Sequence, residues 1–187
     1  MNRQWILSLV VMLPLGLHAC ASIDVKTDYD PEADFTTFKS FAFAGLTETN
    51  KGGIFDNSLT RKRIESAVGR ELTGKGLRQV GLDQHPDLLV HYWIGIQEKQ
   101  RVETTGPAGG YGWRGGYGPA PGYSTVRTYE YKEGTLILDL VEPARNELVW
   151  RAKMVANLED ATQENVELAH KAIAKAFEQY PPTKTVR

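Results

Sequence analysis

Cysteine is almost missing from this chain of 187 residues, because Cys20 is the only one. A single cysteine excludes an intrachain disulfide. The chain also lacks an excess of either charge, with 22 basic and 23 acidic residues, so nucleic acid is not an expected partner. No apolar run reaches the roughly 20 residues that a membrane-spanning helix needs. The hydrophobic fraction of 41% is that of an ordinary globular protein.

Motifs of common enzymes are absent as well. There is no Gly-Lys-Ser/Thr phosphate loop, no G-x-S-x-G nucleophile elbow and no H-E-x-x-H zinc motif. Residues 110–115 match G-x-G-x-x-G, but the Gly- and Pro-rich residues that follow cannot open the helix that a dinucleotide site requires. We therefore predict no catalytic residues, no cofactor and no metal site. We expect His170 near the surface of the last helix, as a solvated or capping residue.

The first 19 residues have the features of a signal peptide. Arg3 makes the start basic, and an apolar run of about 13 residues follows from Trp5 to Leu17. The segment ends Leu17-His18-Ala19-Cys20, which resembles the lipobox of bacterial lipoproteins. This resemblance implies cleavage before Cys20 and a diacylglycerol thioether on its sulfur. Two or three acyl chains at this position anchor a protein stably to a membrane.

A second cleavage site is an alternative. Ala19-Cys20-Ala21 is also an A-x-A site for ordinary signal peptidase, which would release a soluble periplasmic protein. Ala21 directly after the cysteine resembles the sorting pattern of outer-membrane lipoproteins, whereas Asp would favour the inner membrane. We expect residues 20–187 to form a single domain that lipid on Cys20 tethers to the periplasmic face of the outer membrane.

The mature chain contains both strand and helix patterns. Five strands are predicted, at residues 23–29, 41–43, 87–97, 129–141 and 148–158. Apolar stripes predict two amphipathic helices, at residues 58–74 and 160–180. The order predicts an α+β fold of two layers, in which a mostly antiparallel sheet of about five strands has both helices on one face. In the last strand, alternation places Leu148 with Trp150 on the buried face and Val149 on the other.

Residues 106–122 are the most unusual segment. Eight of these 17 residues are Gly and three are Pro, so the segment is not expected to pack as a helix or strand. The candidate contacts for a partner protein or a glycan in and beside this loop are Tyr111, Trp113, Arg114, Tyr117 and Tyr123. The alternative is a spacer that folds over the half-apolar face of the strand at 87–97.

Several motifs follow the lipobox in a fixed order. They are D-Y-D-P-x-A-D-F-x-x-F-K-S-F-A-F at 28–43, P-D-L-L-V at 86–90, E-G-T-L-I-L-D-L at 133–140, L-V-W-R at 148–151 and Y-P-P at 180–182. Together with the Gly- and aromatic-rich insertion, they resemble the bacterial lipoproteins grouped as domain-of-unknown-function family 4136. The resemblance implies an envelope lipoprotein with an α+β fold and no known activity. We expect Asp28 and Asp30 to fix a turn, and Trp150 to lie in the core with Arg151 outside.

These features favour a non-enzymatic binding or assembly module of the cell envelope. Its expected partners are the membrane, reached through the N-terminal lipid, and an envelope protein or a cell-wall glycan. One alternative is an envelope hydrolase whose catalytic residues meet only in the folded chain, which predicts a pocket with at least two buried titratable groups. The other is a purely structural lipoprotein, which predicts no binding phenotype for any surface variant.

Overall fold

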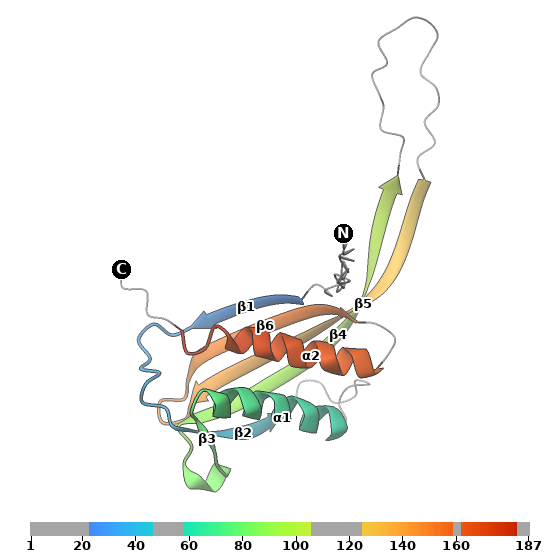
Figure 1. Cartoon of the computed structure of the whole chain (residues 1–187). Helices are drawn as coiled ribbons and strands as arrows, with labels where there is room; N and C mark the ends of the chain where they lie inside the picture. The colour runs from blue at the N-terminus through green and yellow to red at the C-terminus, as the bar shows by residue number, and fades with distance from the viewer. Residues whose placement is uncertain (1–22, 47–57, 106–124, 159–161, 183–187) are drawn as a thin grey trace, which may run out of the picture.

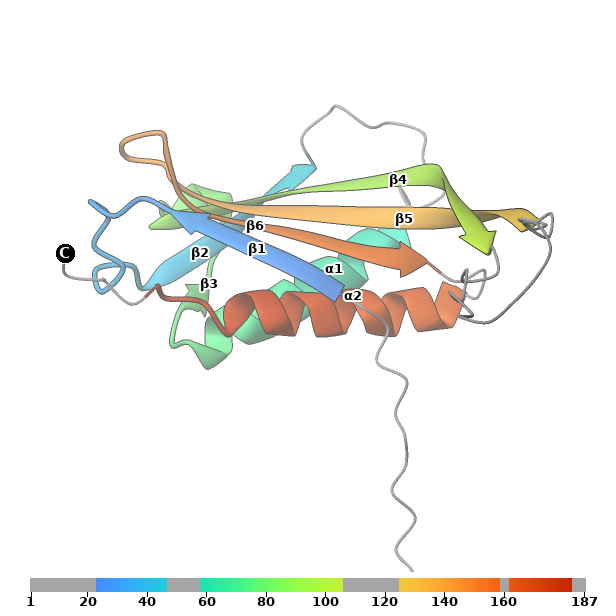
Figure 2. The ribbon, with the colours of Figure 1, turned by 90° about the horizontal axis from the view of Figure 1, so that it is seen from above.

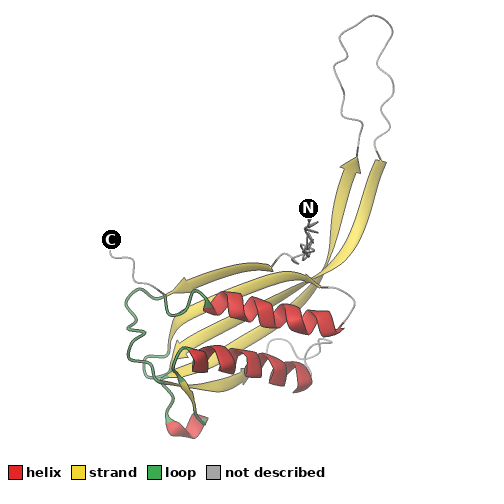
Figure 3. Cartoon of the chain, in the orientation of Figure 1, coloured by secondary structure: helices red, strands yellow, loops and turns green. Residues whose placement is uncertain are grey.

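The computed structural model describes residues 23–46, 58–105, 125–158 and 162–182, which form one sheet with two helices on one face (Figures 1 and 3). The strands are β1 Ile23–Tyr29, β2 Ser40–Leu46, β3 Arg78–Gln79, β4 Leu88–Thr105, β5 Thr125–Glu142 and β6 Glu147–Leu158. The helices are α1 Ser58–Gly74 and α2 Thr162–Phe177, with a short 3-10 helix at Leu82–Gln84. Figure 2 shows α1 and α2 along the same face of the sheet.

The α+β fold with two layers is confirmed, but the sheet has six strands rather than five. Their order is β1-β6-β5-β4-β2-β3. Strands β1, β6, β5 and β4 pair antiparallel, whereas β2 pairs parallel to both β4 and β3. The parallel pairing arises because α1 lies between β2 and β4 in the chain and gives the crossover that parallel neighbours need. Strand β3 has only two residues, too few to show alternation in the sequence.

Strands β4 and β5 are longer than predicted, with 18 residues each. They stay paired from Leu89 and Val141 to Thr105 and Thr125. The predicted end of β4 at residue 97 and the predicted start of β5 at residue 129 were wrong. A hairpin that is exposed to solvent on both faces shows little hydrophobic alternation in its sequence. The outer half of this hairpin extends beyond the two-layer body as an arm, defined here as residues 97–105 and 125–133 (Figure 1).

The core lies between the sheet and the two helices. On α1 the predicted stripe is confirmed, because Ile64, Ala67, Val68 and Leu72 are all buried. The buried residues of α2 and of the three central strands are Ala172, Ile173, Ala176, Phe177, Leu88, Val90, Tyr92, Leu136, Leu138, Leu140, Val149, Trp150, Ala152 and Met154. Residues spaced three or four apart on a helix and two apart on a strand therefore meet in a single apolar layer.

The predicted faces of β6 were wrong at its start. Leu140 pairs with Trp150, but the next residue, Val141, pairs with Leu148, so Val149 is an extra residue in a β-bulge. Val149 is fully buried, whereas Leu148 is 41% exposed. The bulge shifts the alternation by one residue, which sequence periodicity alone does not reveal.

Candidate functional site

The residues that the sequence predicts as functional lie outside the described part of the chain. They are Cys20, the loop 106–122, Tyr111, Trp113, Arg114, Tyr117 and Tyr123. The described residues end at Thr105 and resume at Thr125, and these two residues pair at the tip of the arm. Among the described residues, a functional surface can therefore lie only on the two-layer body or on the arm.

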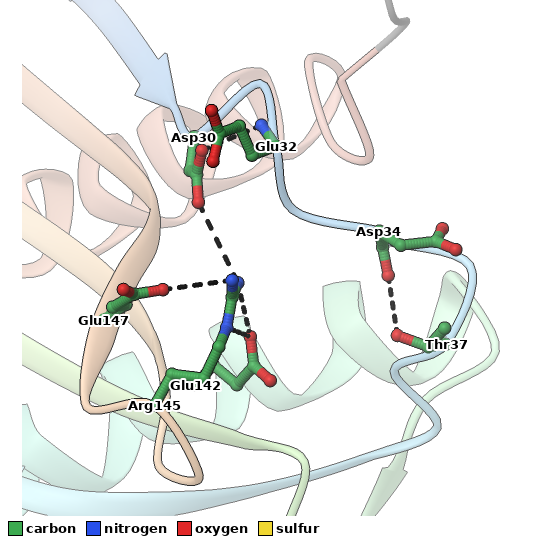
Figure 4. A network of polar contacts seen from close by, with 7 residues as sticks. All are labelled: Asp30, Glu32, Asp34, Thr37, Glu142, Arg145 and Glu147. Carbon is green, nitrogen blue, oxygen red and sulfur yellow. Dashed lines mark hydrogen bonds and ion pairs between the residues drawn. The ribbon is translucent and has the colours of Figure 1, made fainter.

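Two aspartates of the motif at 28–43 fix turns, and for Asp30 this was expected. Asp28 instead lies within β1, where its carboxylate accepts a hydrogen bond from the Tyr29 amide at 2.9 Å. The carboxylate of Asp30 accepts a hydrogen bond from the Glu32 amide at 2.8 Å, and that of Asp34 accepts one from the Thr36 amide at 3.0 Å. The Thr37 hydroxyl donates to the carbonyl of Asp34 at 2.7 Å (Figure 4). Such local bonds are the usual reason for Asp in turns, so this part of the motif has a structural role.

Arg145 ties the turn between β5 and β6 to the turn after β1. Its guanidinium lies 2.8 Å from Glu142, 3.1 Å from Glu147 and 3.9 Å from Asp30 (Figure 4). The hydrogen bond with Glu142 is the largest cause that raises the pKa of Arg145. Because the cluster is solvent-facing and each carboxylate already faces a cation, its chemistry is that of a surface ion-pair network.

Asp87, from the P-D-L-L-V motif, holds the beginning of β2 against β4. Its Oδ2 accepts hydrogen bonds from the amides of Lys39 and Ser40, both at 2.9 Å, and from the Ser40 hydroxyl at 2.8 Å. The Ser40 hydroxyl in turn accepts one from the Asp87 amide at 3.0 Å. Burial by itself would raise the pKa of Asp87, but these hydrogen bonds outweigh it and lower the pKa.

The L-V-W-R and Y-P-P motifs meet in the core. Trp150 is 1% exposed, and its ring lies 5.5 Å from that of Tyr180 and 5.2 Å from that of Phe177. Burial raises the pKa of Tyr180 to about 12. Arg151 points away from the core and makes two hydrogen bonds, at 2.7 and 2.6 Å, with Asp139. The interpretation of a core Trp with an outward Arg is confirmed.

The face of the sheet opposite the helices carries an aromatic surface. The indole of Trp93 covers Gly95, since a Cβ on Gly95 would come within 2.1 Å of its ring. Tyr129 and Tyr131 lie on the same face farther along the hairpin, because they pair with Arg101 and Lys99, eight and six residues after Trp93. We name Trp93, Tyr129 and Tyr131 the aromatic row.

Polar side chains surround the outer part of the aromatic row. A shallow depression there is lined by Arg101, Glu103, Tyr129, Tyr131 and Asn157. Next to it, the ammonium group of Lys99 lies 2.6 Å from the carboxylate of Glu133, and this hydrogen bond raises the pKa of Lys99. A flat surface that combines ring faces with hydrogen-bonding groups is suited to stacking and polar contact with an extended ligand.

A second feature is an apolar cavity of about 100 Å³ between the helices and the sheet. It is partly open to solvent. Its wall comes from the first half of α1, the part of α2 from Asn165 to Ala172, the middle of β4 and β5 and the second half of β6. Its apolar lining includes Ile64, Ile94, Ile96, Leu136, Met154, Leu158, Val166, Leu168 and Ala169.

His170 lies in the wall of this cavity, and the prediction of a solvated His170 was wrong. Its Nε2 atom is buried and has no hydrogen-bond partner among the described residues. The sequence signal was ambiguous, because His170 directly follows the apolar stripe position Ala169. Only the packing of α2 against the sheet decides that the imidazole turns inward.

Neither a metal-binding cluster nor a membrane-spanning helix occurs among the described residues. No group of three or more His, Cys, Asp or Glu side chains there is arranged to hold a metal ion. No helix in this part of the chain is long and apolar enough to cross a membrane.

Comparison with known proteins agrees with the fold. The family model described as a domain of unknown function, DUF4136, matches residues 25–182. A DUF4136 family protein from Bacteroides thetaiotaomicron is similar in structure, with 20% identity, a TM-score of 0.51 and coverage of 85% of this chain and 96% of that chain. No curated protein sequence matches the chain.

A PDZ domain protein from Parabacteroides distasonis is also similar in structure, with 21% identity and a TM-score of 0.55. The match covers 88% of this chain but only 37% of that protein, so the chain spans little more than a third of its length. At these identities the two structures show a shared fold and nothing about a shared ligand.

Proposed function

The chain belongs to the DUF4136 family, and we propose that it is a lipid-tethered envelope protein that binds glycan strands without catalysing a reaction. The tether rests on the sequence Leu17-His18-Ala19-Cys20, with Cys20 as the attachment point. Strand β1 begins at Ile23, only three residues after this cysteine. A lipid at Cys20 would therefore hold the β1 end of the body close to the membrane.

The observation that carries the glycan proposal is the position of Trp93 on Gly95. A side chain at residue 95 would occupy the space of the indole, so glycine leaves room for the ring on the strand. An aromatic ring on this surface can stack on the C–H groups of a sugar, and Tyr129 and Tyr131 continue the same surface. Arg101 and Glu103 add a donor and an acceptor for hydroxyl groups.

The length of the aromatic row is a second reason to expect an extended ligand. The pairs from Trp93–Ile137 to Arg101–Tyr129 span eight residues of β4, or roughly 26 Å at 3.3 Å per residue. This length suits several successive sugar rings and exceeds a single small molecule. The candidate residues of the loop 106–122 follow the tip of the same arm in the chain, so they would extend this surface.

The two alternatives gain less support from the described residues. Among the described residues no Asp, Glu, His, Lys or Arg side chain is fully buried. The buried titratable groups, Tyr92 and Tyr180, are phenols packed in the hydrophobic core, whereas a hydrolase was expected to have at least two such groups in a pocket. A purely structural role does not require aromatic side chains on the exposed arm, where Tyr129 is 46% exposed. We therefore prefer the binding role.

Cosedimentation with purified peptidoglycan sacculi tests the glycan proposal. The mature chain, residues 20–187 with Cys20→Ala, should pellet with sacculi, and Trp93→Ala and Tyr129→Ala should each lower the bound fraction at least threefold. Deletion of residues 106–122 should lower it as well. Val102→Ala is the matched control, because Val102 lies on the opposite face of the same arm and is 61% exposed. Binding that survives both aromatic substitutions, or capture of envelope proteins in place of sacculi, would contradict the proposal.

Mass spectrometry of the mature N-terminus tests the tether separately. The expected species begins at residue 20 and carries the mass of a diacylglycerol with or without a third acyl chain. The Cys20→Ala protein should lack this mass and leave the membrane fraction. An unmodified chain that begins at Ser22 would instead support the soluble periplasmic alternative.

A further inference from the structure

The cavity between the helices and the sheet is not explained by folding. Protein interiors pack about as densely as organic crystals, and few of their voids exceed a water molecule. This cavity has about 100 Å³ and an almost entirely aliphatic wall. Side chains that leave such space unfilled give up packing contacts, which an apolar ligand would restore.

We propose that the cavity binds a saturated fatty-acyl chain. An apolar cavity of roughly 150 Å³ can hold benzene, so about 100 Å³ accommodates a short length of alkyl chain, with the remainder leaving through the open side. None of the lining residues is Phe, Tyr or Trp, so the wall offers an aromatic ligand no large ring to stack on. A flexible alkyl chain fits such a wall better than a rigid ring.

Polar groups in the wall suit the head of a fatty acid. The Nε2 atom of His170 is buried without a partner, and a carbonyl or carboxyl oxygen of the ligand would give it one. Arg63, an exposed residue of α1, also lines the cavity and supplies a positive charge for a carboxylate. An unpaired buried polar atom costs free energy, so pairing it would favour binding.

The cavity also lies near the proposed tether, and this part of the argument depends on the proposed function. Ile23, the first residue of β1, pairs with Ala156, which lines the cavity. Ile23 comes three positions after Cys20, a reach of at most about 11 Å. The acyl chain has two possible sources, the lipid on Cys20 itself or a lipid of the membrane, and the two share the same chemistry.

Methionine offers a single reporter inside the cavity. The chain has three methionines, of which Met1 and Met12 precede Cys20 and Met154 lies in the cavity wall. In residues 20–187 with Cys20→Ala, a ¹³C-methyl-methionine label therefore gives one signal. This part of the chain contains every residue of the described core and all of the residues that the family model matches.

Titration with dodecanoic acid below its critical micelle concentration should shift the Met154 methyl signal in a saturable way. Affinity should rise about fourfold with each added methylene from octanoic acid onward, until the cavity is full. Ala169→Phe, which fills the cavity from α2, should weaken binding at least tenfold. Ala174→Phe is the matched control on the same helix, because Ala174 does not line the cavity. Its affinity should stay within twofold of the parent.

Two further experiments identify the source of the acyl chain. The lipidated protein and the Cys20→Ala protein are each placed on phosphatidylethanolamine–phosphatidylglycerol vesicles. A shifted Met154 signal in the lipidated protein alone assigns the chain to Cys20, and a shift in both assigns it to the bilayer. The absence of any dodecanoic acid shift in a folded Cys20→Ala protein would overturn the proposal. So would equal affinity in Ala169→Phe, and neither result depends on lipidation.

Discussion

Asp87 shows how a single side chain joins two strands that are distant in the sequence. Its carboxylate receives hydrogen bonds from Lys39 and Ser40, nearly 50 residues earlier, at the point where β2 begins beside β4. The sequence offered P-D-L-L-V only as a motif, and the partners of the aspartate became visible in the folded chain. Other motif residues of this chain have such a structural explanation, as Asp30, Asp34 and Trp150 illustrate.

Replacement of this carboxylate should change how stability depends on pH. The pKa of Asp87 is lowered in the folded chain from its ordinary value of 3.8, so its stabilisation is present above pH 3.8 and is lost as the pH falls through the lower, folded value. Asp87→Asn should lower the free energy of unfolding by about 1 kcal/mol at pH 7. It should also flatten the fall in stability below pH 3.8, as measured by urea denaturation.

The matched control for this experiment is Asp24→Asn. Asp24 lies on β1 in an ion pair of 3.8 Å with Lys26, and both side chains are largely exposed. Such pairs contribute little to stability. If both variants lose the same free energy at pH 7, the strand-joining role of Asp87 is wrong.

At the scale of the element, β6 shows where periodicity misleads. Its alternation predicts Leu148 inside and Val149 outside, and the bulge at Val149 reverses the two. The bulge also lets the carbonyl of Val149 accept a hydrogen bond from the Asp30 amide at 3.0 Å, which ties β6 to the turn after β1. A requirement set by the neighbouring turn therefore overrides the local pattern.

Two asparagine substitutions distinguish the bulge from regular alternation. Val149→Asn places an amide in the core and should cost roughly 2–3 kcal/mol of unfolding free energy. Leu148→Asn changes a side chain that is 41% exposed, and its effect should stay within about 0.5 kcal/mol. Chemical denaturation measures both. A larger loss for Leu148→Asn than for Val149→Asn would mean that β6 pairs in the regular register.

At the scale of the whole molecule, the body and the arm have different compositions. All buried core residues lie outside the arm, with Tyr92 and Leu136 as the nearest ones along β4 and β5. The arm instead consists of cross-strand pairs such as Lys99–Tyr131 and Arg101–Tyr129, which are polar on one or both sides. Stability should therefore come from the body, and the arm is free to serve recognition.

Shortening of the arm tests this division. Residues 100–130 can be replaced by Asn-Gly, a dipeptide that favours a tight turn between paired strands. Lys99 and Tyr131 then become the last pair. Because none of the described residues in this range is buried, the thermal midpoint should change by no more than about 3 °C, or roughly 1 kcal/mol. A shortened chain that no longer unfolds cooperatively would show that the arm belongs to the folding unit.

The sequence by itself determined the two helices, the strand at 23–29, the hairpin between β5 and β6 and the family. These features depend on patterns within a single element. An example is the apolar stripe on one face of α1, formed by Ile64, Ala67, Val68 and Leu72. The family followed in the same way from motifs in a fixed order, and the match over residues 25–182 confirms it.

Only the tertiary structure decided the parallel pairing of β2 with β4, the bulge at Val149, the length of the arm and the inward position of His170. The aromatic row and the cavity belong to the same class, since each joins residues from several strands or helices. The physical reason is that such features depend on register and packing between elements. A pattern along one segment of the chain carries no information about which neighbour it will meet.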